Sequence, residues 1–290
     1  MNERAMNAAL LRRQTVESGR PELSQDAQQA LDRLLRVDDP QGLEAALLAM
    51  LLVPGHDRRL EAWFDETVTV RQADAIRADM ASIGPAALMP WFERVLQRLA
   101  LTPLAERREL LLAVRRLLTL PGPGRAIDRL LWLVVRRGFG ELPWTPPRIV
   151  AAETSPDGEA RLPAASLPDV ARFTAHLARS VPSDQAESLA GRDWYLAVMF
   201  RWQAPAEVPP WRAPDADAMV RALAALERLT WIERPLLVRS WVGEALGHSA
   251  SDWLAPASAD ALRLACVLLD APIPTELARH FVTLPKDAAR

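Results

Sequence analysis

The sequence predicts an all-α protein of about ten to twelve helices, and three observations carry this prediction. Apolar residues recur at i, i+3, i+4 and i+7 through most of the chain, which is the period of an amphipathic helix. Strand patterns are nearly absent, because the best of them, at residues 68–70, is too short to anchor a sheet. Proline and glycine recur between the periodic segments, where they mark helix ends.

The helices can be assigned in order along the chain. The side chains expected to cap helix N-termini are Asp39, Thr102, Ser183 and either Asp215 or Asp217. The turn at Gly84-Pro85 ends one helix near Ser82 and begins the next. The expected helices include residues 41–52, 86–101, 105–120, 184–200, 218–229, 232–246 and 257–269, with a last short turn at 274–281.

Two proline-rich stretches, 139–167 and 203–214, interrupt the helical pattern. The first is the longer one and contains the turn pair Asp157-Gly158, so we expect it to be a linker or a surface loop. The predicted organisation is an N-terminal segment (1–21), an N-terminal helical half (22–140), the proline-rich linker (141–166) and a C-terminal helical half (167–290).

Composition excludes several classes of protein. The chain has 290 residues, half of them hydrophobic, so it is not a disordered tail. The 35 Lys and Arg residues against 37 Asp and Glu residues give no globally basic surface. The single cysteine, Cys266, can form neither an internal disulfide nor a cysteine zinc cluster. No secretory signal or long apolar run is visible, so we expect a cytoplasmic protein without a transmembrane segment.

No pattern typical of a catalytic site is found in the sequence. The four histidines are isolated, and His56 is better placed to cap the next helix. The segment Pro121-Gly122-Pro123-Gly124-Arg125 lacks the lysine of a phosphate loop, and its prolines remove N–H donors. We therefore expect no catalytic residue, no metal ligand and no cofactor, and a protein that is not an enzyme.

Arginine is concentrated in one stretch of the chain. Residues 93–137 contain ten arginines against four acids, a net of six positive charges. Helical spacing places most of these arginines on shared faces of a predicted hairpin, and the candidate surface consists of Arg94, Arg98, Arg108, Arg115, Arg116, Arg125, Arg129 and Arg136. Such a surface could bind an acidic partner, nucleic acid or an anionic membrane. The alternative is an ordinary solvated face in a chain whose composition supplies arginine and only one lysine, Lys286.

Ten tryptophans accompany a single tyrosine, and most of them are expected in the core. Trp211, between Pro210 and Arg212 in a proline-rich stretch, is the best candidate for an exposed contact residue.

Two runs resemble a known family: residues 84–112, beginning Gly84-Pro85-Ala86-Ala87, and the tail 261–274, which contains Cys266. They are similar to the helical extension that follows the protease domain in bacterial membrane zinc metallopeptidases related to CAAX-prenyl proteases. The order of the blocks matches from about residue 22 to residue 281. The resemblance implies two packed TerB-like helical halves.

The chain departs from that family at the features that carry chemistry. The HEXXH zinc helix and the transmembrane helices of the protease are absent from the sequence. Where the family has an acidic Asp-Gly-Arg turn followed by a glutamate, this chain has Pro121-Gly122-Pro123 with Asp128 at the glutamate position. In the second half it has Ser251-Asp252-Trp253, with Ser258 or Asp260 at that position.

The expected function is therefore that of a non-catalytic, cytosolic interaction or adaptor protein, with a membrane-associated protease or envelope-stress system as the partner that the resemblance implies. The alternative is anion or nucleic-acid binding through the arginine-rich hairpin, residues 94–137.

Overall fold

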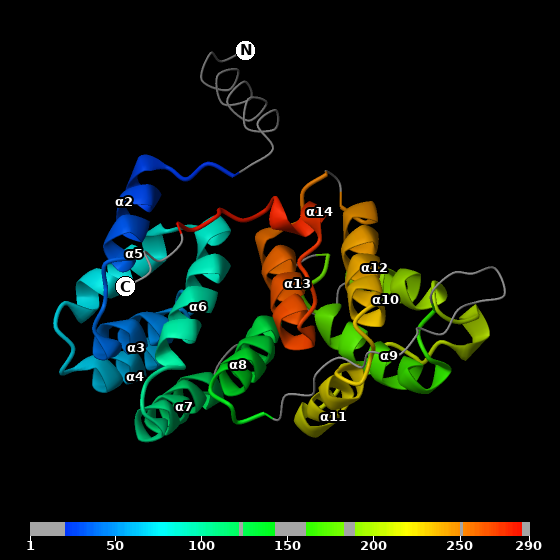
Figure 1. Cartoon of the computed structure of the whole chain (residues 1–290), viewed down its shortest axis with the longest axis horizontal. Coiled ribbons are helices and arrows are strands. Elements are labelled where there is room, and N and C mark those ends of the chain that lie inside the picture. Colours follow the sequence, from blue (N-terminus) through cyan, green and yellow to red (C-terminus); the bar gives the residue numbers. More distant parts are fainter. Residues whose placement is uncertain (1–20, 122–123, 143–160, 183–188, 250–251, 286–290) are drawn as a thin grey trace, which may run out of the picture. The chain divides into compact units, whose positions relative to one another are not determined.

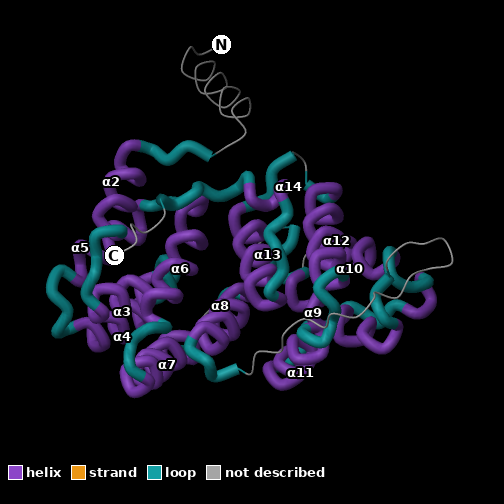
Figure 2. Tube along the Cα trace, in the orientation of Figure 1, coloured by secondary structure: helices purple, strands orange, loops and turns teal. Residues whose placement is uncertain are grey.

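The computed structural model describes residues 21–121, 124–142, 161–182, 189–249 and 252–285. Over this part of the chain the secondary structure is helix and loop, without a strand (Figure 2). It contains thirteen α-helices, twelve of them with seven or more residues, which confirms the all-α fold class.

The chain forms two compact units. Unit 1 comprises residues 1–123 and 278–290, and unit 2 comprises residues 124–277. The helices of unit 1 are α2 (Gln25–Leu34), α3 (Pro40–Ala49), α4 (Asp57–Thr67), α5 (Ala73–Ser82), α6 (Pro85–Leu99) and α7 (Leu104–Thr119). Those of unit 2 are α8 (Ala126–Gly138), α9 (Leu167–Leu177), α10 (Leu189–Phe200), α11 (Ala216–Leu226), α12 (Glu233–Gly247) and α13 (Pro256–Leu269), while the short α14 (Thr275–Ala278) ends at the boundary.

Unit 1 is built around α3, which contacts α4, α5, α6 and α7 (Figure 1). Its sequence is apolar on nearly every side, and seven of its ten residues are buried. The helix begins at the predicted cap, because the Asp39 carboxylate accepts a hydrogen bond of 2.6 Å from the Gly42 N–H. A Cβ on Gly42 would lie 2.7 Å from that carboxylate, so the cap requires glycine at this position.

Two polar side chains are buried in unit 1 beside α3, and both lie on α4. Arg59 is 1% exposed and donates to the Leu51 carbonyl at 2.9 Å, just beyond the end of α3. One turn later, the Trp63 indole donates to the Ala45 carbonyl at 3.0 Å. The buried N–H donors of both side chains thus find backbone acceptors.

The end of the chain returns to unit 1. The Val282 N–H donates to the Ala86 carbonyl at 3.0 Å, and Arg94 on α6 donates to the Pro285 carbonyl. Residues 278–285 are thereby attached to α6.

Unit 2 is built around α13, which contacts α8, α11 and α12. Ten of its fourteen residues are buried, among them Cys266. The helices α9, α10 and α11 pack against one another through α9, which contacts both of the others. Trp241 on α12 stacks on Phe173 of α9, with ring centroids 5.5 Å apart, and its indole donates to the Thr174 hydroxyl at 2.9 Å.

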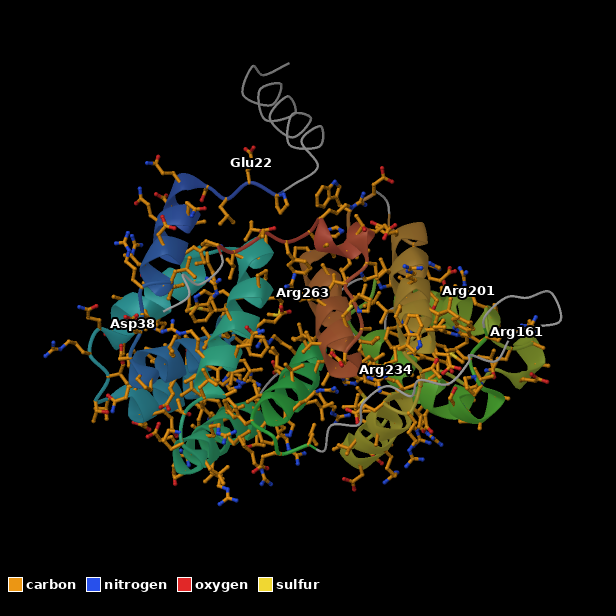
Figure 3. The ribbon with its side chains drawn as sticks, viewed as in Figure 1. Glu22, Asp38, Arg161, Arg201, Arg234 and Arg263 are labelled. Atoms are coloured by element: carbon orange, nitrogen blue, oxygen red, sulfur yellow. The ribbon has the colours of Figure 1, made fainter. Side chains whose placement is uncertain are left out.

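A buried arginine joins three helix ends in unit 2. Arg234, in the first turn of α12, is 1% exposed and donates to the carbonyls of Leu229, Leu269 and Glu227 (Figure 3). The last carbonyls of a helix have no partner within the helix and carry partial negative charge, so a cation is favourable there.

A buried ion pair lies beside Arg234. Arg137 at the end of α8 lies 2.7 Å from the Glu227 carboxylate, and both side chains are almost fully buried. Burial raises the pKa of Glu227, against the opposing effect of the two arginines.

The predicted helix boundaries can now be compared with the structure. The caps at Asp39 and Asp215, the His56 cap and the Gly84-Pro85 turn are confirmed. The cap at Thr102 is wrong, since its hydroxyl donates to the Leu99 carbonyl and the N-cap position of α7 is Pro103. Ser183 lies outside the described residues.

The compact units do not divide the chain where the sequence suggested. α8 belongs to unit 2, whereas the sequence placed residues 22–140 together in an N-terminal half. Much of the predicted linker, residues 143–160, lies outside the described part of the chain, as do residues 1–20.

Over the described residues, none of the helices combines the length and the apolar character that crossing a membrane requires.

Candidate functional site

Five of the eight candidate arginines lie in unit 1, and three of these are engaged by the fold. Arg94 binds the Pro285 carbonyl, as described above. Arg98 donates to the Val37 carbonyl at 2.7 Å, which holds the end of α6 against the α2–α3 loop. Arg116 forms a bidentate pair with Glu66 of α4, at 2.6 and 2.8 Å. These guanidinium groups already have anionic or carbonyl partners.

The other two arginines of unit 1 lie on the solvent face of α7. Arg108 and Arg115 are exposed, and neither guanidinium group makes a hydrogen bond or ion pair with any described residue. Leu112 lies between them on the same face and is 50% exposed. This α7 face is the part of the predicted surface that keeps its charge available.

The remaining three arginines lie in unit 2 and have local roles at α8. Arg125 is the N-cap residue of α8, and its side chain binds Asp128 at 2.8 Å. Arg129 is half-buried and donates to the Pro214 carbonyl at 2.7 Å. Arg136 lies over the ring of Trp132, 5.6 Å from the centroid. The eight arginines are thus divided between two units, and most of them hold the fold together.

Trp211 is half-buried, and this differs from the exposed position expected from the sequence. Its indole donates to the Ala175 carbonyl of α9 at 3.3 Å. The Trp211 indole therefore attaches the proline-rich stretch 203–214 to α9. Trp231, 57% exposed at the turn before α12, is the more exposed tryptophan.

The structure brings together a set of arginines that the sequence analysis did not select. A groove of about 470 Å³ lies between the start of α9 and α11, and it is lined by Asp169, Arg172, Arg221, Ala224, Ala225 and Arg228. We call it the arginine groove. All three of its arginine side chains are exposed. Three guanidinium groups against one carboxylate make its lining electropositive.

The groove follows from the sequence of α11. Arg221, Ala224 and Ala225 recur at i, i+3 and i+4 on one face of α11, and Arg228 follows at i+7 in the turn just beyond the end of the helix. The opposite side of α11 is apolar and buried through residues such as Met219 and Leu223. This spacing is visible in the sequence, but the arginines at 94–137 are denser and form the stronger pattern.

A second hollow, of about 520 Å³, shares Arg172 with the arginine groove. Its lining is richer in apolar groups and includes Ala175 of α9 together with Pro209 and Pro214 of the proline-rich stretch. Tyr195 also lines it and donates its hydroxyl to the Pro209 carbonyl at 2.7 Å. That hydrogen bond holds Pro209, which forms part of the wall of the hollow, in place. Burial raises the pKa of Tyr195 to about 12.

Two buried ionisable groups of unit 2 lie outside the grooves. Asp260 on α13 is 8% exposed, and its Oδ1 atom has no hydrogen-bond partner among the described residues. Burial raises the pKa of Asp260 to about 7, against the charges of Arg263 and Arg125. Neither Asp128, held by Arg125, nor Asp260 is part of a group of three or more potential metal ligands, and no such group occurs among the described residues.

His176 on α9 is the second buried group. Its Nε2 lies 3.2 Å from the Ala126 carbonyl, which can only accept a hydrogen bond, so Nε2 carries the proton. Burial, together with the charges of Arg129 and Arg179, lowers the pKa of His176 to about 3. The ring is therefore buried and uncharged at neutral pH.

Comparison of the chain with family models, with curated proteins and with solved structures found no match. The resemblance to TerB-like helical extensions therefore stays a prediction.

Proposed function

We propose that this chain is a non-catalytic interaction protein that binds its partner through exposed arginine side chains of its helical units. The observation that supports the proposal is the arginine groove. Arg221 lies on α11 and Arg228 in the turn just beyond its end, and neither makes an ion pair with any described residue. Exposed guanidinium groups in a concave surface are suited to bind carboxylates of another chain.

The partner that we propose is a membrane-associated protease or another envelope protein, reached from the cytoplasm. This part of the proposal rests on the resemblance of residues 84–112 and 261–274 to the helical extension of membrane metallopeptidases. In such an arrangement this chain would supply the helical module, and a separate polypeptide would supply the catalytic domain.

Quantitative pull-down from solubilised host membranes tests this proposal. Tagged wild-type chain should recover one membrane protease or envelope protein well above a tag-only control. The double variant Arg221→Glu/Arg228→Glu should no longer recover this protein. The control variant Arg192→Glu/Arg239→Glu carries the same charge change on exposed sites of unit 2 and should still recover it. Recovery of no membrane or envelope protein by the wild-type chain would contradict the proposal.

A second candidate function is anion or nucleic-acid binding by the arginine-rich hairpin, and the α7 face favours it. Arg108 and Arg115 should then retain the chain on heparin or DNA in a salt-dependent way. The variant Arg108→Glu/Arg115→Glu should elute at lower salt. Arg116 is left unchanged in this test because it pairs with Glu66. Unchanged elution of the variant would remove this candidate.

A further inference from the structure

The spacing of charges in the arginine groove restricts what it can bind. Arg221 lies on α11, and Arg228 lies in the turn two residues beyond Leu226, the last residue of the helix, where the Arg228 N–H donates to the Ala225 carbonyl. With a rise of about 1.5–2 Å per residue in such a helix and turn, the two positions lie about 10 Å apart. Between them only Ala224 and Ala225 line the groove. A floor of small residues with a cation at each end allows the backbone of another chain to approach closely.

The third arginine and the aspartate of the groove already form a pair. Arg172 donates to Asp169 at 2.6 Å, and both lie in the first turns of α9. The charge of Arg172 is therefore partly balanced, while no such balance exists for Arg221 and Arg228 among the described residues. Asp169 also places one repulsive charge beside any anion that enters, so sparse carboxylates suit the groove better than a dense polyphosphate.

We propose that the arginine groove binds a short acidic segment of the partner protein, with two carboxylates about 10 Å apart. In an extended chain this separation corresponds to residues i and i+3, at about 3.3 Å per residue. Each carboxylate pairs with one guanidinium group, Arg221 or Arg228, in the fork geometry that arginine offers. This inference rests on the proposed function and names the chemistry of the segment that the partner must carry.

The second hollow adds an apolar element to the same segment. It adjoins the arginine groove at Arg172 and is walled by Pro209, Pro214 and Ala175. The Tyr195–Pro209 hydrogen bond holds this wall in place without a ligand. The partner segment should therefore carry an apolar side chain next to its acidic pair, since a preformed apolar hollow favours such a group.

Fluorescence anisotropy with the full-length chain tests the proposal. The probe is a labelled Gly/Ser peptide that carries two glutamates three residues apart and one leucine beside them. Wild type should bind it, and Arg221→Glu/Arg228→Glu should weaken binding about tenfold or more. The control Arg192→Glu/Arg239→Glu should stay within about twofold, and Asp169→Asn should tighten binding because it removes the repulsive charge.

The proposal would be overturned if the wild-type chain did not bind the peptide, or if the control variant weakened binding as much as Arg221→Glu/Arg228→Glu does. Equal affinity for a peptide with adjacent glutamates would also overturn it. So would binding of a DNA oligonucleotide or anionic vesicles that depends on the groove arginines, in the absence of peptide binding. Circular dichroism of each variant shows whether it is folded. If the peptide does not bind but the pull-down still recovers an envelope protein, the groove assignment fails while the proposed function stands.

Discussion

Unit 1 and unit 2 are each built around one helix that is buried on most of its sides, but the two central helices differ in what they bury. In unit 1 the buried positions of α3 are glycine, alanine and leucine. In unit 2 the buried positions of α13 include Ser258 and Asp260 as well as Cys266. The central helix of unit 1 thus packs through apolar groups, whereas that of unit 2 also buries polar groups, among them the carboxyl of Asp260, whose pKa burial raises.

Each unit also buries an arginine that binds backbone carbonyls. Arg59 of unit 1 donates to the Leu51 carbonyl, and Arg234 of unit 2 donates to the carbonyls of Leu229, Leu269 and Glu227. In unit 1, Arg108 and Arg115 lie on the solvent face of α7. In unit 2, Arg221 and Arg228 line a groove. We therefore expect the proposed recognition surface on unit 2.

The largest expected effect tests the buried arginines. Arg234→Met should lower the free energy of unfolding by about 3–5 kcal/mol, because three buried carbonyls lose a charged donor. Arg59→Met removes the charged donor of the buried Leu51 carbonyl and should also destabilise the chain, by about 2 kcal/mol or more. Urea unfolding followed by circular dichroism measures both, with the exposed Arg239→Met as the control. A loss for either buried arginine no larger than that for Arg239→Met would contradict the role of its buried hydrogen bonds.

The next prediction concerns the pH dependence of unit 2. The pKa of Asp260 is about 7 in the folded chain against 3.8 when unfolded, so its stabilising contribution is complete below pH 3.8 and is lost as pH rises through 7. Asp260→Asn removes this loss. Relative to wild type, the variant should gain about 2–3 kcal/mol between pH 5 and pH 8.5.

Urea unfolding of Asp260→Asn and wild type at several pH values tests this prediction. His176 contributes to stability with the opposite pH dependence, but it does so in both chains, so its contribution cancels in the difference between their free energies of unfolding. The control is Glu44→Gln on α3, where burial and Glu106 also raise the pKa of the carboxyl, but the side chain is only partly buried. The stability that Glu44→Gln gains relative to wild type as the pH rises should be smaller than the gain of Asp260→Asn. Parallel stability curves for wild type and Asp260→Asn would show that Asp260 does not carry the effect.

A smaller effect is expected at the tryptophan hydrogen bonds. Thr174→Val removes the acceptor of the buried Trp241 indole while it keeps the volume, so it should cost about 1–2 kcal/mol in unfolding experiments. In unit 1 the corresponding acceptor of Trp63 is the Ala45 carbonyl, which no side-chain substitution removes. The exposed Thr119→Val is the control and should change stability by less than about 0.5 kcal/mol. An equal loss in the free energy of unfolding for Thr174→Val and Thr119→Val would contradict the role of the buried Trp241–Thr174 hydrogen bond.

The smallest effect is expected for the exposed ion pair of unit 1. Glu66→Gln should cost less than about 1 kcal/mol, because Arg116 is 55% exposed and water replaces much of the interaction. The matched substitution in unit 2, Glu227→Gln, changes a buried pair and should cost more. Thermal unfolding of the two variants side by side measures this order, which would be overturned if Glu66→Gln were the more damaging change.

Much of the fold could be predicted from the sequence, because its signals are local. The helix period, the Asp39 and Asp215 caps and the Gly84 turn all depend on residues within four positions of one another. The Thr102 cap failed because the hydroxyl bonds backward to Leu99, a choice that the pattern alone does not determine.

The candidate site could be predicted less well, because its chemistry depends on distant contacts. Arg98 binds a carbonyl 61 residues away and Arg129 one 85 residues away, and no local pattern shows that their charges are engaged. The spacing of Arg221 and Arg228 is visible in the sequence, but the groove also needs Arg172 of α9, which only the packing of the two helices supplies.

The most direct measurement of the central claim is site-specific photocross-linking in host cells, with the photoreactive residue at Ala224 in the arginine groove or at Arg115 on α7. We expect one defined membrane or envelope protein to cross-link from Ala224, at a site beside an acidic segment. The same product should be absent from the Arg115 position and lost in the Arg221→Glu/Arg228→Glu background. A product that forms from Arg115 and not from Ala224 would contradict the assignment of recognition to unit 2.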